Sequence, residues 1–274
     1  MRVLIISDGS EASRQVLKFG AQFSESSGQY LTVLTIVSSA SERDWGKTIL
    51  RHARELFLNQ FPKMQMKVRI GQASEEILEE AKYGQFELVV FGDPGIGGTT
   101  RGLLKRFGIL NVVEKAPCSV LVVKGPYRSI RKILLCDSGV EESSLPGRFV
   151  VRYVDLSEQE EEVTILHVMS QISAGPGIKG RLLRAEAEDL IQENTPEGRV
   201  LERNIEVLKQ PLIRAYPKIR HGFVVDEILD EAKAGDYDLV MIGAHRREGW
   251  WGLLLDDLAQ KIILQIDRSI LIVP

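Results

Sequence analysis

Short apolar runs alternate along the chain with segments in which apolar residues recur every three or four positions. Val3–Ile6 is a continuous apolar run, typical of a strand buried on both faces of a parallel sheet. The segments between such runs have the period of amphipathic helices. Strands that alternate with helices predict right-handed βαβ units, and hence an α/β fold with helices on both faces of the sheet.

The first half of the chain is expected to contain five strands and four helices. The strands are predicted at residues 3–6, 31–37, 66–70, 88–91 and 120–123. Ser10 is a suitable N-cap for the first helix, a second covers residues 47–59, and Ser74 begins a third. The fourth helix lies between a glycine-rich segment and the last strand.

Ligands of such sheets bind beyond the carboxyl ends of the strands, near the point where the strand order reverses. In this chain that position brings together Asp8, Val37, Gly71 and the segment Gly92 to Gly98. We therefore expect one site at this edge of the first sheet.

The second half of the chain repeats the first. Residues 75–92 (EEILEEAKYGQFELVVFG) and 226–243 (DEILDEAKAGDYDLVMIG) are identical at more than half of their positions. Residues 118–123 match 268–273, and residues 3–8 match 133–137. Three blocks in one order indicate a duplication. We predict two doubly wound, five-stranded parallel sheets in tandem (Rossmann-like α/β/α sandwiches), residues 1–126 and 129–274.

The second copy departs from the first in its helices. Pro146-Gly147 falls where the first copy has an uninterrupted helix, which predicts a disturbed first helix. Residues 171–196 are longer than their counterpart and contain Gly-Pro-Gly, which predicts a flexible surface segment. Helices are expected at residues 180–193 and 200–213.

Composition excludes several classes of function. Hydrophobic residues make up 44% and charged residues 27%, as in ordinary soluble proteins, and a net charge of -3 gives no reason to expect nucleic acid. No apolar run approaches the roughly 20 residues of a membrane span, and residues 1–8 lack the pattern of a signal peptide. Cys118 and Cys136 are expected to be buried thiols, the four histidines are too scattered for a metal site, and the predicted location is the cytoplasm.

Residues 3–13 (VLIISDGSEAS) closely resemble the opening strand and turn of universal stress protein domains. Residues 71–78, 89–92 and 116–123 resemble the later blocks of that family, in the same order, and the second copy is similar mainly across its 226–243 block and final strand. The chain resembles tandem members of the family, which are similar to a family dimer with paired final strands. The resemblance implies an intramolecular pseudo-dimer, in which this pairing covers two flat apolar edges. Homodimerisation and an unidentified protein partner remain further options.

Family members that bind ATP or AMP carry the pattern G-x2-G-x9-G-[ST] after the fourth strand. Its glycines let backbone N–H groups approach phosphates at a helix N-terminus. Gly95, Gly98 and Gly108 have this spacing, but Ile109 follows where Ser or Thr is expected. A second register, counted back from residues 116–118, places Arg106-Phe107 at the Gly-Ser pair.

The resemblance therefore implies a nucleotide site in the first copy, for ATP or AMP, with Mg²⁺ accompanying ATP. The residues assigned to it are Asp8, Gly9, Ser10, Val37, Gly71, Gly92, Gly95, Gly98, Thr99, Arg106 and Gly108. The alternative is a glycine-rich turn beside a solvated basic helix face.

The second copy is predicted to be degenerate. Asp256-Asp257 falls where the family has Gly-Ser, and each carboxylate would repel a phosphate by on the order of a kcal/mol or more. Trp250 and Trp251 are assigned to loop packing or an interface, with a base-stacking platform as the alternative. Asp8 and Asp137 end the first strand of the two copies, where an aspartate can equally form a turn or cap a helix.

Three functions remain open. The first is a stress-response nucleotide sensor with little or no catalysis, and the second is an interaction scaffold that binds no nucleotide. The third is an enzyme of a related nucleotide-dependent fold, such as a weak ATPase. Residues 138–143 (SGVEES) faintly resemble the phosphate loop of ATP pyrophosphatases, but they lack its second glycine and aspartate. No P-loop is present, and no nucleophile–base pair can be placed.

Overall fold

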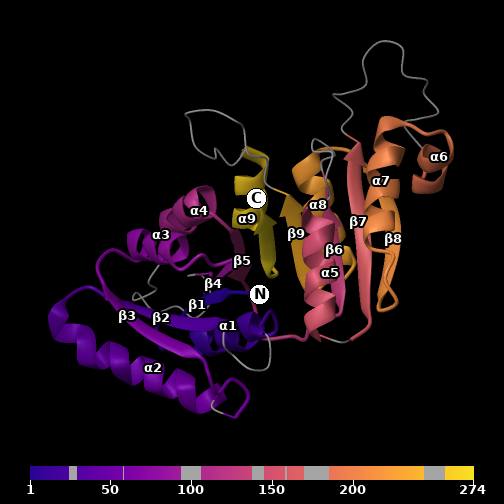
Figure 1. Ribbon diagram of the computed structural model, residues 1–274. Coiled ribbons are helices and arrows are strands. Elements are labelled where there is room, and N and C mark those ends of the chain that lie inside the picture. Colours follow the sequence, from indigo (N-terminus) through magenta and orange to yellow (C-terminus); the bar gives the residue numbers. More distant parts are fainter. Residues whose placement is uncertain are drawn as a thin grey trace. The chain divides into compact units, whose positions relative to one another are not determined.

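A computed structural model describes residues 1–24, 30–57, 59–93, 106–137, 145–157, 159–169, 185–243 and 257–274, with the backbone alone at residues 106, 107 and 257. The chain forms two compact units. The first contains Met1–Ser129 and the second begins at Ile130. Strands and helices alternate in both units, so the prediction of an α/β fold is confirmed (Figure 1).

The first unit is a five-stranded parallel sheet with helices. Its strands are β1 (Val3–Ile6), β2 (Leu31–Val37), β3 (Gln65–Ile70), β4 (Leu88–Gly92) and β5 (Ser119–Val123). Its helices are α1 (Glu11–Ala21), α2 (Arg43–Phe57), α3 (Ala73–Tyr83) and α4 (Arg106–Lys115), and a 3₁₀ turn, η1 (Ala40–Glu42), precedes α2. The strand order β3-β2-β1-β4-β5 reverses between β1 and β4.

Burial explains why these segments form these elements. Every residue of β1 and of β2 is buried, as expected for central strands covered on both faces. One face of α2 buries Ile49, Leu50 and Ala53, and this face packs on β2 and β3. The helix begins at Arg43, four residues before the predicted start. The prediction missed these residues because the first turn is largely exposed and adds little to the apolar stripe.

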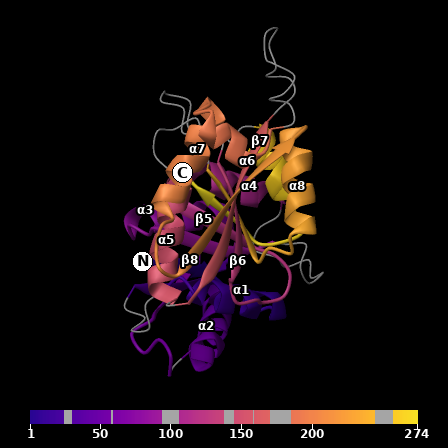
Figure 2. The ribbon, with the colours of Figure 1, turned by 90° about the vertical axis from the view of Figure 1, so that its right-hand side faces the viewer.

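The second unit has the same topology. Its strands are β6 (Lys132–Cys136), β7 (Glu161–Met169), β8 (Ile213–His221), β9 (Leu239–Gly243) and β10 (Ile270–Val273). Its helices are α5 (Leu145–Ser157), α6 (Ala187–Gln192), α7 (Pro196–Val207), α8 (Val224–Ala234) and α9 (Asp257–Gln265). The strands are parallel in the order β8-β7-β6-β9-β10, with α5 and α7 on one face of the sheet and α8 on the other (Figure 2).

Three helices of the second unit differ from their predictions. Helix α5 is not interrupted by Pro146-Gly147, because both residues lie in its first turn, where a missing backbone N–H costs nothing. Ile213 begins β8, so α7 ends at Val207 rather than at residue 213. Of the helix predicted at 180–193, the described part is the short α6, which starts at Ala187.

Both cysteines are buried thiols outside any disulfide, as expected. Burial, with smaller contributions from Glu231 and Asp137, raises the pKa of the Cys136 thiol far above its usual value. Cys136 is therefore protonated and unreactive at neutral pH.

Candidate functional site

The carboxyl end of β1 forms a tight turn around Asp8. Its Oδ1 atom accepts hydrogen bonds from the Ser10 backbone N–H at 2.9 Å and from the Ser10 hydroxyl at 2.6 Å. Ser10 Oγ in turn accepts from the Ser13 N–H at 3.1 Å, so Ser10 is the N-cap of α1 as predicted. Within the described part of the chain, no hydrogen bond reaches the second carboxylate oxygen of Asp8. That oxygen can therefore accept a bond from a ligand.

Gly9 is required by this turn whether or not a ligand binds. Its φ of +78° lies in the left-handed region, and a Cβ would lie 2.8 Å from Ile49 Cγ1 of α2. The glycine therefore fixes how closely α2 approaches the end of β1.

Val37 and Gly71 lie together beside Asp8. The Gly71 N–H donates to the Val37 carbonyl at 3.0 Å, which joins the end of β2 to the turn after β3. Because β2 neighbours β1 in the sheet, these main-chain groups lie at the same edge as Asp8. The structure thus brings Asp8, Val37 and Gly71 to one edge, as the topology predicted.

Gly92 ends β4, the neighbour of β1 on its other side. A Cβ there would lie 2.8 Å from Val16 Cγ2, so close packing against α1 favours glycine at this position. Gly95, Gly98 and Thr99 lie outside the described residues. Helix α4 begins at Arg106 and includes Gly108 in its first turn.

The sequence analysis missed an ion pair at this edge. Lys124, directly after β5, places Nζ 3.0 Å from Oδ2 of Asp93, directly after β4. The Lys124 side chain is only 7% exposed. The signal was available, because both residues follow predicted strands that run in parallel.

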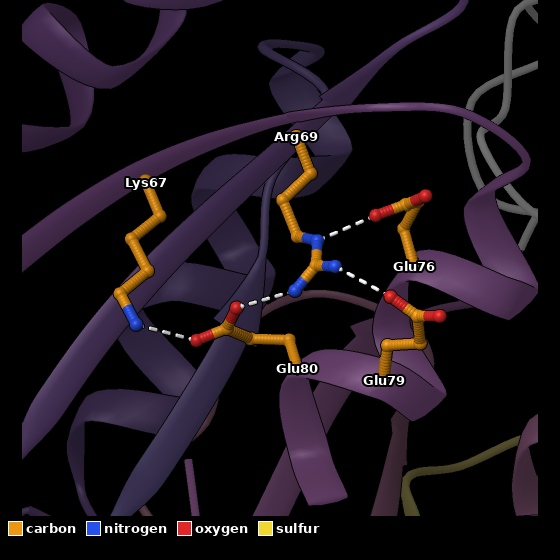
Figure 3. A network of polar contacts seen from close by, with 5 residues as sticks. All are labelled: Lys67, Arg69, Glu76, Glu79 and Glu80. Carbon is orange, nitrogen blue, oxygen red and sulfur yellow. Dashed lines mark hydrogen bonds and ion pairs between the residues drawn. The ribbon is translucent and has the colours of Figure 1, made fainter. Parts of the chain in front are cut away.

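A second feature that the sequence analysis missed is a charged network between β3 and α3, which we call the first clamp (Figure 3). Its residues are Lys67, Arg69, Glu76, Glu79 and Glu80. Arg69 Nε donates to Glu76 at 2.5 Å, Nη2 to Glu79 at 2.7 Å and Nη1 to Glu80 at 2.9 Å. Lys67 Nζ donates to the other oxygen of Glu80 at 2.5 Å. Burial acts to raise the pKa of Glu80, but the hydrogen bonds from Lys67 and Arg69 outweigh it, so this pKa lies below its usual value.

The second unit contains an equivalent network between β8 and α8, the second clamp. Arg220 Nε donates to Glu227 at 2.5 Å and Nη1 to Glu231 at 3.0 Å, while Lys218 Nζ donates to Glu231 at 2.9 Å. Tyr237 adds a hydroxyl bond to Glu231 at 2.8 Å. The two clamps therefore share the same strand-to-helix construction, and the first lies beside the candidate site.

The two strand-end aspartates are not equivalent, although the sequence comparison aligned them. The ladders pair Ile6 with Leu34 in the first unit and Cys136 with Leu166 in the second. The next residue along, Ser7 or Asp137, donates its N–H to the carbonyl of Leu34 or Leu166. Asp137 thus occupies the position of Ser7, one residue before that of Asp8. Asp137 therefore does not stand at the position from which Asp8 offers its carboxylate.

Asp137 is held inside the second unit. Its Oδ2 atom accepts from Asn204 Nδ2 at 2.7 Å and lies 3.6 Å from Arg203 Nη2, both on α7. His167 Nδ1 lies 3.1 Å from the Asp137 carbonyl and donates to it. The Asp137 side chain is 12% exposed and that of Asn204 is fully buried. This carboxylate stabilises the packing of α7 against the sheet.

Most of the other residues named for the second copy lie in the segment before α9. Trp250, Trp251 and Asp256 lie outside the described residues, and Asp257 begins α9. Among the residues that are described, no group of three or more His, Cys, Asp or Glu could hold a metal ion. In the same part of the chain, no helix is long and apolar enough to cross a bilayer.

Fold and site together define a class: two doubly wound α/β domains in tandem, the first with polar groups at its switch point. The model of the universal stress protein family matches the chain twice, at residues 1–124 and 129–274. The chain belongs to the universal stress protein family.

Solved structures of similar fold cover the whole chain. A putative universal stress protein from Pseudomonas aeruginosa UCBPP-PA14 is 15% identical, with a TM-score of 0.65 over 100% of this chain and 93% of that one. A functionally unknown protein, PA1789 from Pseudomonas aeruginosa PAO1, is 14% identical, with a TM-score of 0.64 over 100% and 92%. A universal stress protein from Archaeoglobus fulgidus is 13% identical, with a TM-score of 0.58 over 99% and 95%. No curated protein matches the sequence.

Proposed function

We propose that this tandem universal stress protein acts in the stress response by binding one adenine nucleotide, ATP or AMP, in its first unit, with little or no catalysis. The second unit is its structural partner and binds no nucleotide. The observation that carries the proposal is the difference between the two strand ends. Asp8 keeps one carboxylate oxygen available beside Val37 and Gly71, whereas Asp137 is displaced by one residue and bonded to α7.

The remaining assigned groups support a phosphate end for this ligand. In the sequence, Gly95, Gly98 and Thr99 precede α4, and the helix begins at Arg106. Glycines and a cation close to the start of a helix are residue types that favour phosphate binding. Mg²⁺ would accompany ATP and would neutralise part of its phosphate charge. The described residues contribute a carboxylate, main-chain groups and turn glycines, a set suited to binding.

Isothermal titration calorimetry with ATP and AMP, with and without Mg²⁺, tests the proposal. We expect one nucleotide bound per chain and no phosphate release above background during incubation with ATP. Two nucleotides per chain would contradict the assignment of the second unit. No binding at millimolar nucleotide would contradict the proposal itself and favour an interaction scaffold.

Replacing Asp8 by asparagine should weaken nucleotide binding by about tenfold, because a charge-assisted hydrogen bond to the ligand becomes a neutral one. The amide oxygen can still accept from Ser10, so the turn and the fold should persist. The matched control is Asp137→Asn, which removes a strand-end charge from the second unit and should leave nucleotide affinity unchanged. Equal losses in both variants, or none in Asp8→Asn, would refute the role given to Asp8.

A further inference from the structure

We propose that Arg69 is a positioning residue of the first unit: through Glu76 it holds the Gly71 turn, and with it the main-chain groups at the ends of β2 and β3 that a ligand meets. This inference rests on the proposed function. Arg69 itself does not touch the ligand in this proposal. Its role is to fix the geometry of the edge at which Val37 and Gly71 lie beside Asp8.

The first step of the argument is the contact between Gly71 and Glu76. A Cβ on Gly71 would lie 2.5 Å from Glu76 Oε1, so the carboxylate packs directly against the bare Cα of the turn. Gly71 has a φ of +154°, a value that glycine adopts readily, and its N–H is bonded to the Val37 carbonyl at 3.0 Å. Movement of Glu76 would therefore release the turn and the end of β2 together.

The second step is the bond that holds Glu76 in place. Arg69 stands on β3, two residues before Gly71, and donates from Nε to Glu76 Oε2 at 2.5 Å. Glu76 of α3 thus contacts both Arg69 of β3 and the Gly71 turn that connects the two elements. The side chains are 26% exposed for Arg69 and 19% for Glu76, so water screens this pair less than it screens a surface salt bridge.

The third step is the need for arginine. One guanidinium group bonds three carboxylates on two turns of α3, those of Glu76, Glu79 and Glu80. A lysine presents a compact point charge and cannot reproduce this planar fork. Arg69→Lys therefore keeps the charge of the first clamp but loses its geometry.

The second unit supplies a matched control within the same molecule. Arg220 donates to Glu227 at 2.5 Å, and a Cβ on Gly222 would lie 2.4 Å from Glu227 Oε1. Gly222 donates its N–H to Met169 at 3.2 Å, as Gly71 does to Val37. The Arg220 side chain is 27% exposed, a value close to the 26% of Arg69. Arg220→Lys thus repeats the structural damage in a unit that we do not expect to bind nucleotide.

The experiment compares Arg69→Lys with Arg220→Lys in the full chain. Amide hydrogen exchange is measured by NMR without nucleotide, and ATP affinity is measured by calorimetry. For Arg69→Lys we expect the Gly71 amide to exchange at least about tenfold faster, with exchange in β1 and β4 unchanged. ATP affinity should fall about three- to tenfold. For Arg220→Lys we expect faster exchange at Gly222 and unchanged ATP affinity.

The outcomes separate this inference from the proposed function. Unchanged exchange at Gly71 in Arg69→Lys overturns the inference whether or not nucleotide binds. Faster exchange at Gly71 with unchanged ATP affinity in Arg69→Lys would contradict the positioning role and leave Arg69 a structural role alone. An equal loss of ATP affinity in Arg220→Lys would also contradict it, because the effect would then come from general destabilisation. If the unmodified protein binds no ATP, the proposed function fails and the ligand-positioning role fails with it, while the exchange result still reports whether Arg69 holds the turn.

Discussion

Replacing Glu161 by glutamine is expected to stabilise the second unit by about 3 kcal/mol at pH 8 and to flatten its pH dependence between about pH 4.5 and 7. Glu161 begins β7 and is 1% exposed. Its Oε1 atom lies 3.4 Å from the Ser157 hydroxyl, and its Oε2 atom is buried without a hydrogen-bond partner in the described part of the chain. Burial raises the pKa of Glu161 to about 7, against the opposing effects of Arg131 and Ser157, while Asp238 adds to the rise.

The sign follows from the direction of this shift. The pKa of Glu161 in the folded protein lies above its unfolded value of 4.5, so the folded state holds the proton more tightly. Stability from this group is fully present below pH 4.5 and is lost as the pH rises through 7. Glutamine keeps the shape of the protonated acid without titrating. The paired carboxylates Glu80 and Glu231 have pKa values below the usual one, so they act in the opposite direction and at lower pH.

The measurement is denaturant unfolding at several pH values between 5 and 8, followed by hydrogen exchange of peptides from β6 and β7. These peptides isolate the second unit, since unfolding of a two-unit chain need not be a single transition. The control is Glu162→Gln, the next residue on the same strand, whose side chain is exposed. Parallel pH profiles for Glu161→Gln and the unmodified protein would show that Glu161 is ionised in the fold.

The sequence predicted the strands of the first unit well, because most of them are buried and leave continuous apolar runs. The repeat then identified three of the strands of the second unit. The sequence analysis misplaced the start of α2 and wrongly expected α5 to be disturbed. The exposed first turn of α2 has no apolar stripe, and Pro146 can break a helix or begin one equally well. The pairing of the two final strands stays a prediction.

The site was predicted less completely, for a different reason. An apolar run followed by an aspartate is the same pattern in both copies, and only the hydrogen-bonded ladder reveals that Asp137 stands one residue earlier than Asp8. The clamps did leave a signal. A lysine and an arginine two residues apart precede two glutamates four residues apart, at the same spacing in both copies. Residues two apart lie on the same face of a strand, and residues four apart lie on the same face of a helix. The spacing therefore places both cations on one face of the strand and both carboxylates on one face of the helix.

The displacement of Asp137 by one residue relative to Asp8 also predicts an energetic coupling between Asp137 and Asn204. The buried residues Ile49, Leu50 and Ala53 of α2 have the same spacing as Val200, Leu201 and Asn204 of α7, so Asn204 stands in the place of Ala53. The first unit thus has Ser7 and Ala53 where the second has Asp137 and Asn204. The second unit has replaced a small neutral pair by a hydrogen-bonded polar one.

Asn204→Ala should destabilise the second unit by about 3 kcal/mol, because the mostly buried carboxylate of Asp137 loses the hydrogen bond from Asn204 at 2.7 Å, while Arg203 lies further away, at 3.6 Å. Asp137→Ser alone should cost about 2 kcal/mol. The double variant restores the arrangement of the first unit and should cost at least about 1 kcal/mol less than the two single changes together.

The free energies come from exchange of the most protected amides of β6 and β7, in the unmodified protein and all three variants. Asp137→Ser combined with Arg214→Ala, an exposed residue paired with Glu160, provides the additive control. Coupling between Asp137→Ser and Asn204→Ala, with none between Asp137→Ser and Arg214→Ala, would establish that Asp137 faces α7. The end of β6 would then lack the carboxylate that Asp8 offers at the end of β1. Additive losses would instead mean that Asp137 points toward the ligand edge, which would return the second unit to consideration as a nucleotide site.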